Sequence, residues 1–371
     1  ASSCHQEEVV TPNDLGSNSQ EFGLDKNQMA IQVSQLLKDQ ANLSNVIPLL
    51  EQNRGGIKLS QALEKMENKE AHGKSFNTLM SMVEESLNKY SGQDAKIIEV
   101  PELWLHKPST SFELDEILIA FVPEVNQKEL DKIPAYNLKQ EVVYLDPNKA
   151  PDKPVIVVET DGFEAFKIKV EHINQKLQEN GLQKEGLNTG NKKTLSAEGF
   201  LETTVLNSIS IADTKEEWYK GASEIYAVTS GIYNVDENNP QINVIAMQYI
   251  ADSEQTYYPN QIVLVWDDYD YQAANIQFFE QDSNYNYQDL ATVLVDGVFE
   301  ITGLLTDLPW ITALGRIANA IIQAIPEGAF TDGDDYVDSF YTVQKDMTYT
   351  NWEGVGGNAK ISISPLNIAE N

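Results

Sequence analysis

The sequence predicts an α+β protein. An N-terminal region of helices and a small α/β unit precedes a C-terminal antiparallel β-sandwich with an inserted helical hairpin. From about residue 200 onward, the spacing of the hydrophobic residues changes from a helical period to strict alternation, and the net charge becomes more negative. Residues 1–199 hold 31 acidic against 21 basic side chains, a net charge of −10, whereas residues 200–371 hold 26 against 5, a net charge of −21. We therefore expect a polar leader or tether at 1–23, an α+β domain at 24–185, a linker at 186–199 and an acidic domain at 200–371.

Helices are predicted in the first part of the chain, because apolar residues recur every three to four positions between residues 24 and 90. Three or four short helices fit this spacing. Gly55 and Gly56 separate two of them, and Pro48 starts or kinks one because its ring disfavours a helix interior. Ser75 is a residue type that caps helix starts, so we expect the last helix to begin there.

Short β-like runs follow these helices and predict a small sheet. The runs are 97–100, 103–105, 117–122, 142–145 and 155–159. The last run is nearly all β-branched, which is typical of a buried strand. A helix is then expected from a cap at Asp161 through Asn180, with Gly181 closing it.

Apolar and polar residues alternate after residue 200, which predicts antiparallel strands that form a sandwich. The runs are 203–211, 224–232, 242–250, 261–266, 274–280, 337–344 and 359–363. Residues 288–325 instead have the apolar spacing of two helices. In the second of their two helices the polar residues form one stripe, so we expect a hairpin that covers one face or edge of the sandwich. The stripe is Thr312, Arg316, Asn319 and Gln323.

The composition excludes several classes of function. The 371 residues include 26 basic and 57 acidic side chains, and the net charge of −31 repels nucleic acid and anionic lipid. Arg54 and Arg316 are the only arginines, so few side chains can bind a phosphate through two hydrogen bonds. A single cysteine excludes an intrachain disulfide scaffold. We expect no nucleic-acid partner, and a membrane only through a lipid anchor.

Small residues precede the lone Cys4, which resembles the end of a bacterial lipoprotein signal whose thiol becomes acylated. The alternative is a free thiol in an exported chain, or one that joins two chains. The shortage of cysteine and arginine and the many Tyr, Asn and Asp residues of the second half favour export to the cell envelope or the exterior. A salt-adapted host would produce the same acidity.

Catalytic motifs are absent from the sequence. The four histidines have no second histidine at metal-site spacing, and neither a Gly-x-Ser-x-Gly elbow nor a glycine-rich phosphate loop occurs. The histidines are His5, His72, His106 and His172. Carboxylates abound, so a hydrolase that uses a pair of them remains an alternative.

Acidic turns in the second half predict a calcium site. Residues 266–270, 282–289 and 331–338 combine Asp with Asn, Gly or Tyr. Calcium takes six to eight oxygen ligands in flexible geometry, and crowded carboxylates repel one another unless a cation compensates them. The candidate ligands are Asp213, Asp282, Asn284, Asn286, Asp289 and Asp334. Solvated acidic turns without a metal are the alternative.

Two resemblances add to these observations. The strands that end near Asp213 and at Glu280 both lead to acidic loops, which resembles the C2 type of sandwich, although the helical insertion departs from it. Five stretches resemble a family of uncharacterised exported bacterial proteins, a domain of unknown function, over about residues 24–365. They are 101–105, 150–159, 258–262, 274–280 and 334–338. This resemblance implies no reaction, but it implies a periplasmic or extracellular location.

Together these observations predict an exported, non-enzymatic, calcium-binding surface or envelope protein. Its sandwich would recognise a protein or glycan on the cell surface, because aromatic rings stack and oxygen atoms form hydrogen bonds. The alternatives are a structural or assembly subunit that forms a homo-oligomer through its leader or helical insertion, and a carboxylate-pair hydrolase.

Overall fold

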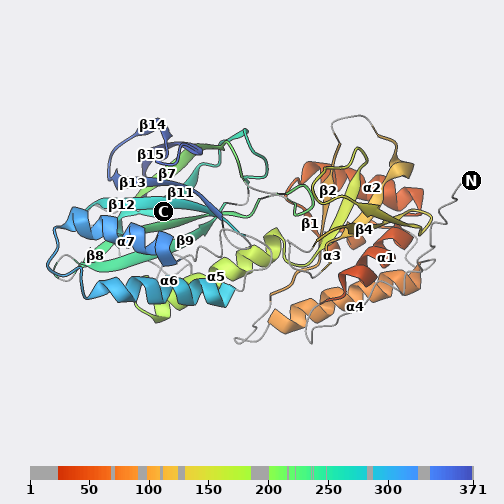
Figure 1. Ribbon diagram of the computed structural model, residues 1–371, viewed down its shortest axis with the longest axis horizontal. Coiled ribbons are helices and arrows are strands. Elements are labelled where there is room, and N and C mark those ends of the chain that lie inside the picture. The colour runs from red at the N-terminus through yellow and green to blue at the C-terminus, as the bar shows by residue number, and fades with distance from the viewer. Residues whose placement is uncertain are drawn as a thin grey trace, which may run out of the picture. The chain divides into compact units, whose positions relative to one another are not determined.

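The computed structural model confirms a mixed α+β protein (Figure 1). Contacts divide the chain into two compact units. The first comprises Ala1–Asp161 and Glu217–Tyr219, and the second comprises Gly162–Glu216 and Lys220–Asn371. The structure describes residues 24–67, 72–90, 98–108, 112–123, 130–184, 200–214, 217–221, 223–234, 236, 238–247, 249–281, 287–324 and 335–369.

A six-stranded sheet organises the first unit. Its strands lie in the order β1 (Ile57–Lys58), β2 (Glu102–His106), β6 (Val155–Glu159), β3 (Leu118–Phe121), β4 (Ile133–Asn137) and β5 (Val142–Leu145). The β3 and β6 strands are parallel, and the other neighbours are antiparallel. The β-branched run at 155–159 is a buried strand, as its composition predicts.

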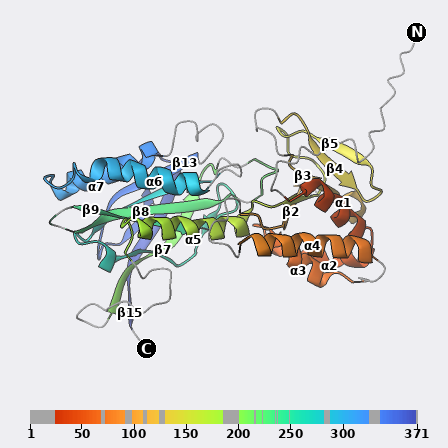
Figure 2. The same cartoon turned by 90° about the horizontal axis from the view of Figure 1, so that it is seen from below.

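Four helices cover one face of this sheet (Figure 2). They are α1 (Lys26–Leu36), α2 (Gln40–Gln52), α3 (Leu59–Lys65) and α4 (Gly73–Tyr90). Side chains alternate across a strand, so Ile119 and Ile156 pack against the helices while their neighbours point to the other face. Helix α4 begins two residues before the predicted Ser75, whose hydroxyl donates instead to Gln35 Oε1 at 2.7 Å.

The other face of the sheet carries a second apolar cluster, which includes Leu118 and Val157. Trp218 and Tyr219 pack against this cluster, which explains why a three-residue segment from much later in the chain belongs to the first unit. The Trp218 ring lies edge-on to His106 at 5.4 Å, and its Nε1 donates to the Asp146 carbonyl at 3.1 Å.

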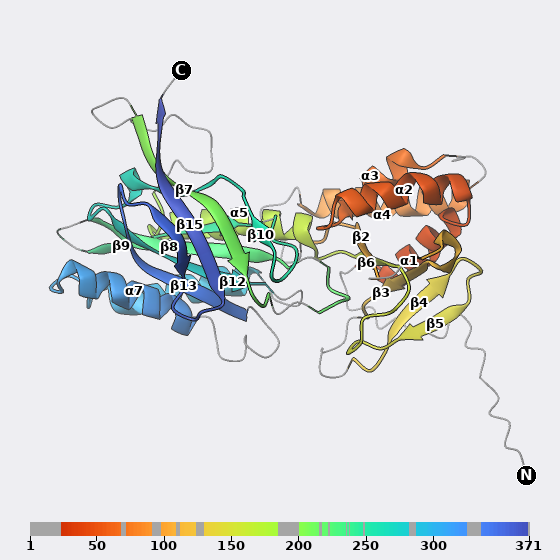
Figure 3. The same ribbon diagram turned by 90° about the horizontal axis from the view of Figure 1, so that it is seen from above.

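Two antiparallel sheets form the second unit. One contains β10 (Thr256–Tyr257), β7 (Phe200–Ile211), β15 (Ala359–Ala369) and β14 (Tyr349–Glu353), and β11 (Gln261–Val265) also pairs with β7. The other contains β13 (Asp335–Gln344), β12 (Ala273–Glu280), β8 (Ile225–Asn234) and β9 (Asn239–Ala246). Apolar side chains of both sheets, such as Ile209 and Phe278, share one core. Figure 3 shows β7 and β15 side by side.

The predicted helical hairpin is present as α6 (Tyr287–Thr302) and α7 (Trp310–Ala324). The polar stripe of α7 faces solvent, and most of its apolar residues, among them Leu314 and Ile317, are buried on the side that contacts the four-stranded sheet. Two side-chain amides of β12 attach α7 to the sheet. Asn275 Nδ2 donates to the Leu314 carbonyl and Gln277 Nε2 donates to the Ala318 carbonyl, both at 3.1 Å. No helix in the described parts of the chain is long and apolar enough to cross a membrane.

Helix α5 (Phe163–Glu179) belongs to the second unit, whereas the local sequence pattern groups it with the first. The Asn174 side chain explains this placement, because it bonds both the N–H (2.9 Å) and the carbonyl (2.7 Å) of Val244 in the edge strand β9. The N–H of Ile242 donates to the Leu182 carbonyl at 2.7 Å. Helix α5 and the residues after it therefore protect a sheet edge. The predicted linker lies outside the described residues.

Candidate functional site

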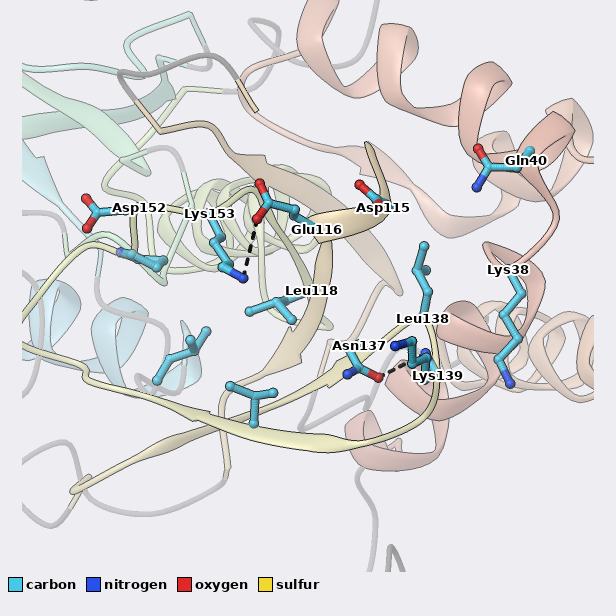
Figure 4. A pocket seen from close by; sticks show the side chains of 13 residues that line it. Lys38, Gln40, Asp115, Glu116, Leu118, Asn137, Leu138, Lys139, Asp152 and Lys153 are labelled. Atoms are coloured by element: carbon cyan, nitrogen blue, oxygen red, sulfur yellow. Dashed lines mark hydrogen bonds and ion pairs between the residues drawn. The ribbon is translucent and has the colours of Figure 1, made fainter. Parts of the chain in front are cut away.

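A groove of about 730 Å³ opens in the first unit (Figure 4). Its apolar floor comes from Leu118, Val143 and Leu145, which belong to or pack against the cluster on the face that the helices leave free. Binding sites for small molecules in proteins have volumes of about 300–1,000 Å³. The lining residues are Lys38, Gln40, Asp115, Glu116, Leu118, Asn137, Leu138, Lys139, Val143, Leu145, Pro151, Asp152 and Lys153.

Two tight turns build one end of the groove. Lys38 lies in the turn between α1 and α2, just before Asp39, which caps α2 by accepting from the N–H of Ala41 at 3.0 Å. Lys139 lies in the turn between β4 and β5. There Asn137 Oδ1 accepts from the N–H groups of Lys139 and Glu141, both at 2.9 Å.

The second of these turns is also attached to a helix. Gln140 has a φ of +70°, and its Nε2 donates to Ser34 Oγ in α1 at 2.6 Å. This hydrogen bond holds the β4–β5 turn against the helix that leads to Lys38. The two lysines consequently lie on the same side of the groove in Figure 4, although 101 positions separate them in the sequence.

Two other segments build the opposite side. A 3₁₀ turn, η2 (Leu114–Glu116), carries Asp115 and Glu116, and the loop before β6 carries Asp152 and Lys153. The loop is held in place because the N–H of Leu118 donates to the Pro154 carbonyl at 3.0 Å. In Figure 4 Asp152, Lys153 and Glu116 lie across the groove from the two lysines.

The charged groups of the groove are largely available to a ligand. Lys153 Nζ lies 3.6 Å from Glu116 Oε1, but both side chains are about half exposed, and such pairs contribute little. Within the described chain Lys38, Lys139, Asp115 and Asp152 take part in no ion pair. The lining contains no cysteine, serine, threonine, histidine or tyrosine among the described residues.

No sequence pattern identifies this groove, because five separate segments contribute to it and none carries a motif. The one local signal is the Asn137-to-Glu141 stretch, which separates two apolar runs as a hairpin turn does. That signal predicts a turn but no site.

Asp213, the first predicted calcium ligand, is exposed just after β7. Its N–H donates to Asn358 Oδ1, and its carbonyl accepts from Asn358 Nδ2, both at 2.9 Å. The same Nδ2 lies 3.3 Å from the Val337 carbonyl. Asn358 therefore joins the end of β7 to β13.

The other predicted ligands are less informative. Asp282, Asn284, Asn286 and Asp334 lie outside the described residues, as does Cys4. Asp289 lies in α6, but its side chain is not described. In the described parts of the chain no group of three or more His, Cys, Asp or Glu side chains could hold a metal ion. Calcium binding stays a prediction of the sequence.

Two acidic residues of the predicted calcium-binding clusters are buried in the protein. Asp268, in the 3₁₀ turn η4 (Trp266–Asp268), is 1 % exposed. Asp338, in β13, is fully buried, and its carboxylate accepts from the N–H groups of Ser339, Gly356, Asn358 and Ala359 at 2.6–2.8 Å. Four backbone donors compensate the charge of Asp338, which therefore has a structural role.

The chain belongs to the family described as "Protein of unknown function (DUF3103)", whose model matches residues 26–371. The match spans both units, as the resemblance of the five stretches implies. No curated protein and no solved structure matched the chain. The resemblance to C2 domains therefore stays a prediction.

Proposed function

We propose that this protein is a non-catalytic recognition protein of the cell envelope or exterior, and that it holds a ligand in the groove of its first unit. The observation that carries the proposal is the combination of an apolar floor with four charged groups that no ion pair in the described chain occupies. Ligand pockets in proteins are typically apolar and carry a small number of polar or charged groups. The acidic, arginine-poor composition supports the location.

Filling the groove tests this function. Val143 and Tyr144 are neighbours on β5 whose side chains point to opposite faces, and of the two only Val143 lines the groove. We expect small fragments from a chemically diverse set to shift the nuclear magnetic resonance signals of groove residues, and Val143→Trp to abolish these shifts. Tyr144→Trp, on the opposite face, is the matched control. Fragments that bind Val143→Trp as well as they bind the parent, or that never perturb the groove, would refute the proposal.

A carboxylate-pair hydrolase is the alternative from a different class, because the groove contains Asp115, Glu116 and Asp152. Incubation with glycosides and peptides, followed by mass spectrometry, separates the two functions. Turnover that Val143→Trp abolishes would replace the binding proposal by the catalytic one.

Calcium binding in the second unit is a second candidate function. The observation that favours it is that the described ends of β7, β12 and β13 next to the predicted segments are joined to one another. Glu280, at the end of β12, pairs with Asp335 at the start of β13, and Asn358 joins β13 to the residue after β7. Loops that begin at the same end of a sandwich can share one cation.

A further inference from the structure

The groove of the first unit separates positive from negative charge. Figure 4 shows Lys38 and Lys139 at one end of the groove and Asp152 at the other end, with Asp115 between the two ends. Nothing in the described chain pairs these groups with one another. Each of the four side chains is exposed and comes from a turn or a loop. A ligand that carries both charges can bridge them.

The floor between the two charged sides is apolar. Leu118 occupies the middle of Figure 4, with Val143 and Leu145 of β5 also lining the groove. A sugar would leave this floor unfilled and the charges unpaired. A fatty acid would cover the floor and pair with the lysines, but it would leave Asp115 and Asp152 facing an apolar chain. The lining therefore favours a ligand with an anionic end, an apolar middle and a cationic end.

The strand that lines the groove adds a second, independent observation. β5 is the last strand of the sheet and pairs only with β4, so one side of its backbone has no partner strand among the described residues. Free N–H and carbonyl groups along an edge strand are suited to the amide groups of an extended peptide. The Gln40 side chain, which lines the groove and makes no hydrogen bond in the described chain, offers a further amide.

Building on the binding function proposed above, we propose that the ligand is a short peptide with free ends. Its C-terminal carboxylate lies at Lys38 and Lys139, its N-terminal ammonium lies at Asp152, and its apolar side chains cover the floor. Such a peptide brings an opposite charge to both ends of the groove. It also explains why the lining combines both signs in a chain whose net charge is −31.

The test uses the full chain and the tetrapeptide Ala-Leu-Leu-Ala in four forms: free at both ends, amidated at the C-terminus, acetylated at the N-terminus, and blocked at both. Isothermal titration calorimetry measures each affinity. Loss of an ion pair with exposed side chains at one end costs about 1 kcal/mol, which is about fivefold in Kd. We expect each single block to weaken binding by this factor, and the double block to weaken it further.

Charge variants locate the contacts. Lys38→Gln with Lys139→Gln should remove the preference for a free C-terminus and leave the preference for a free N-terminus. Asp152→Asn should do the reverse. Lys149→Gln is the matched control, because Lys149 is exposed in the same unit and does not line the groove. All four of these side chains are exposed, so the substitutions leave the fold intact.

Equal affinity for the free and the blocked peptides would overturn the peptide proposal, as would charge variants that leave the preferences unchanged. Absence of any peptide binding, while fragments still bind the groove and Val143→Trp still abolishes their binding, would overturn the peptide proposal and leave the binding function standing. Absence of both would overturn the two together.

Discussion

Substitution of Asp338 by asparagine should destabilise the second unit strongly, although the two side chains have nearly the same shape. Oδ1 accepts from the N–H groups of Ser339 (2.8 Å) and Gly356 (2.6 Å), and Oδ2 accepts from those of Asn358 (2.8 Å) and Ala359 (2.7 Å). An amide retains one of these oxygens and presents N–H groups to the other two donors. Asp338→Asn thus removes two hydrogen bonds to a charged acceptor.

Each hydrogen bond to a charged group contributes about 1.5–3 kcal/mol, so the cost lies between about 3 and 6 kcal/mol. The turn that contains Gly356 can relax, so we expect a value near the lower bound. Chemical denaturation with urea, followed by circular dichroism, measures the free energy of unfolding. Hydrogen exchange should also accelerate at the amides of Gly356, Asn358 and Ala359, because these three bonds attach the turn before β15 to β13.

Asp270→Asn is the matched control, since Asp270 is an exposed aspartate in the same unit. Its free energy of unfolding should stay within about 0.5 kcal/mol of the parent. An Asp338→Asn protein that is as stable as this control would refute the structural role of the buried carboxylate. Gly354→Ala perturbs the same site, because a Cβ at Gly354 would overlap the Asp338 carboxylate. The two substitutions should therefore destabilise less in combination than the sum of their separate effects.

Three further predictions concern other parts of the molecule. Gly231→Ala should cost about 1–3 kcal/mol in urea unfolding, because its Cβ would overlap the Tyr269 ring in the closely packed core; an unchanged midpoint would contradict this. Burial raises the pKa of Tyr136 to about 12, so above pH 10 the unfolded chain loses a proton that the native state keeps. Stability should then fall by about 2–3 kcal/mol up to pH 12, and Tyr136→Phe should remove this part of the pH dependence in urea titrations. Calcium at millimolar concentration should raise the melting temperature of chelator-treated protein and release heat in calorimetry; neither signal would appear if the acidic turns bind no metal.

Strands in which apolar and polar residues alternate strictly are predictable from the sequence, because the side of each strand that faces the core must be apolar. The β7, β8 and β12 strands all overlap predicted runs. The β4 and β14 strands were missed for local reasons. Pro134 interrupts β4 and lacks the N–H of a ladder strand, and β14 carries several exposed polar residues and no alternating apolar set.

The placement of α5 shows the limit of local patterns. A helix after the central strand β6 is expected to fold back onto the same sheet, as in β-α units. The Asn174 side chain instead bonds the backbone of β9, 70 positions away. The period of the helix predicts that it has an apolar face, but it does not predict which sheet that face covers. The pairing depends on contacts between distant residues, which a single sequence does not reveal.

The groove could not be predicted from the sequence either, because contacts between distant residues bring its charged and apolar side chains together. A chain with a net charge of −31 repels free anions as a whole, and at about 0.1 M salt this repulsion is screened over about 10 Å. A simple anion would therefore approach Lys38 and Lys139 against the field of the protein. A peptide with free ends has no net charge, so the overall field does not repel it, and the local separation of charge in the groove still orients it. A zwitterion is thus the kind of ligand for which two lysines are sufficient in so acidic a protein.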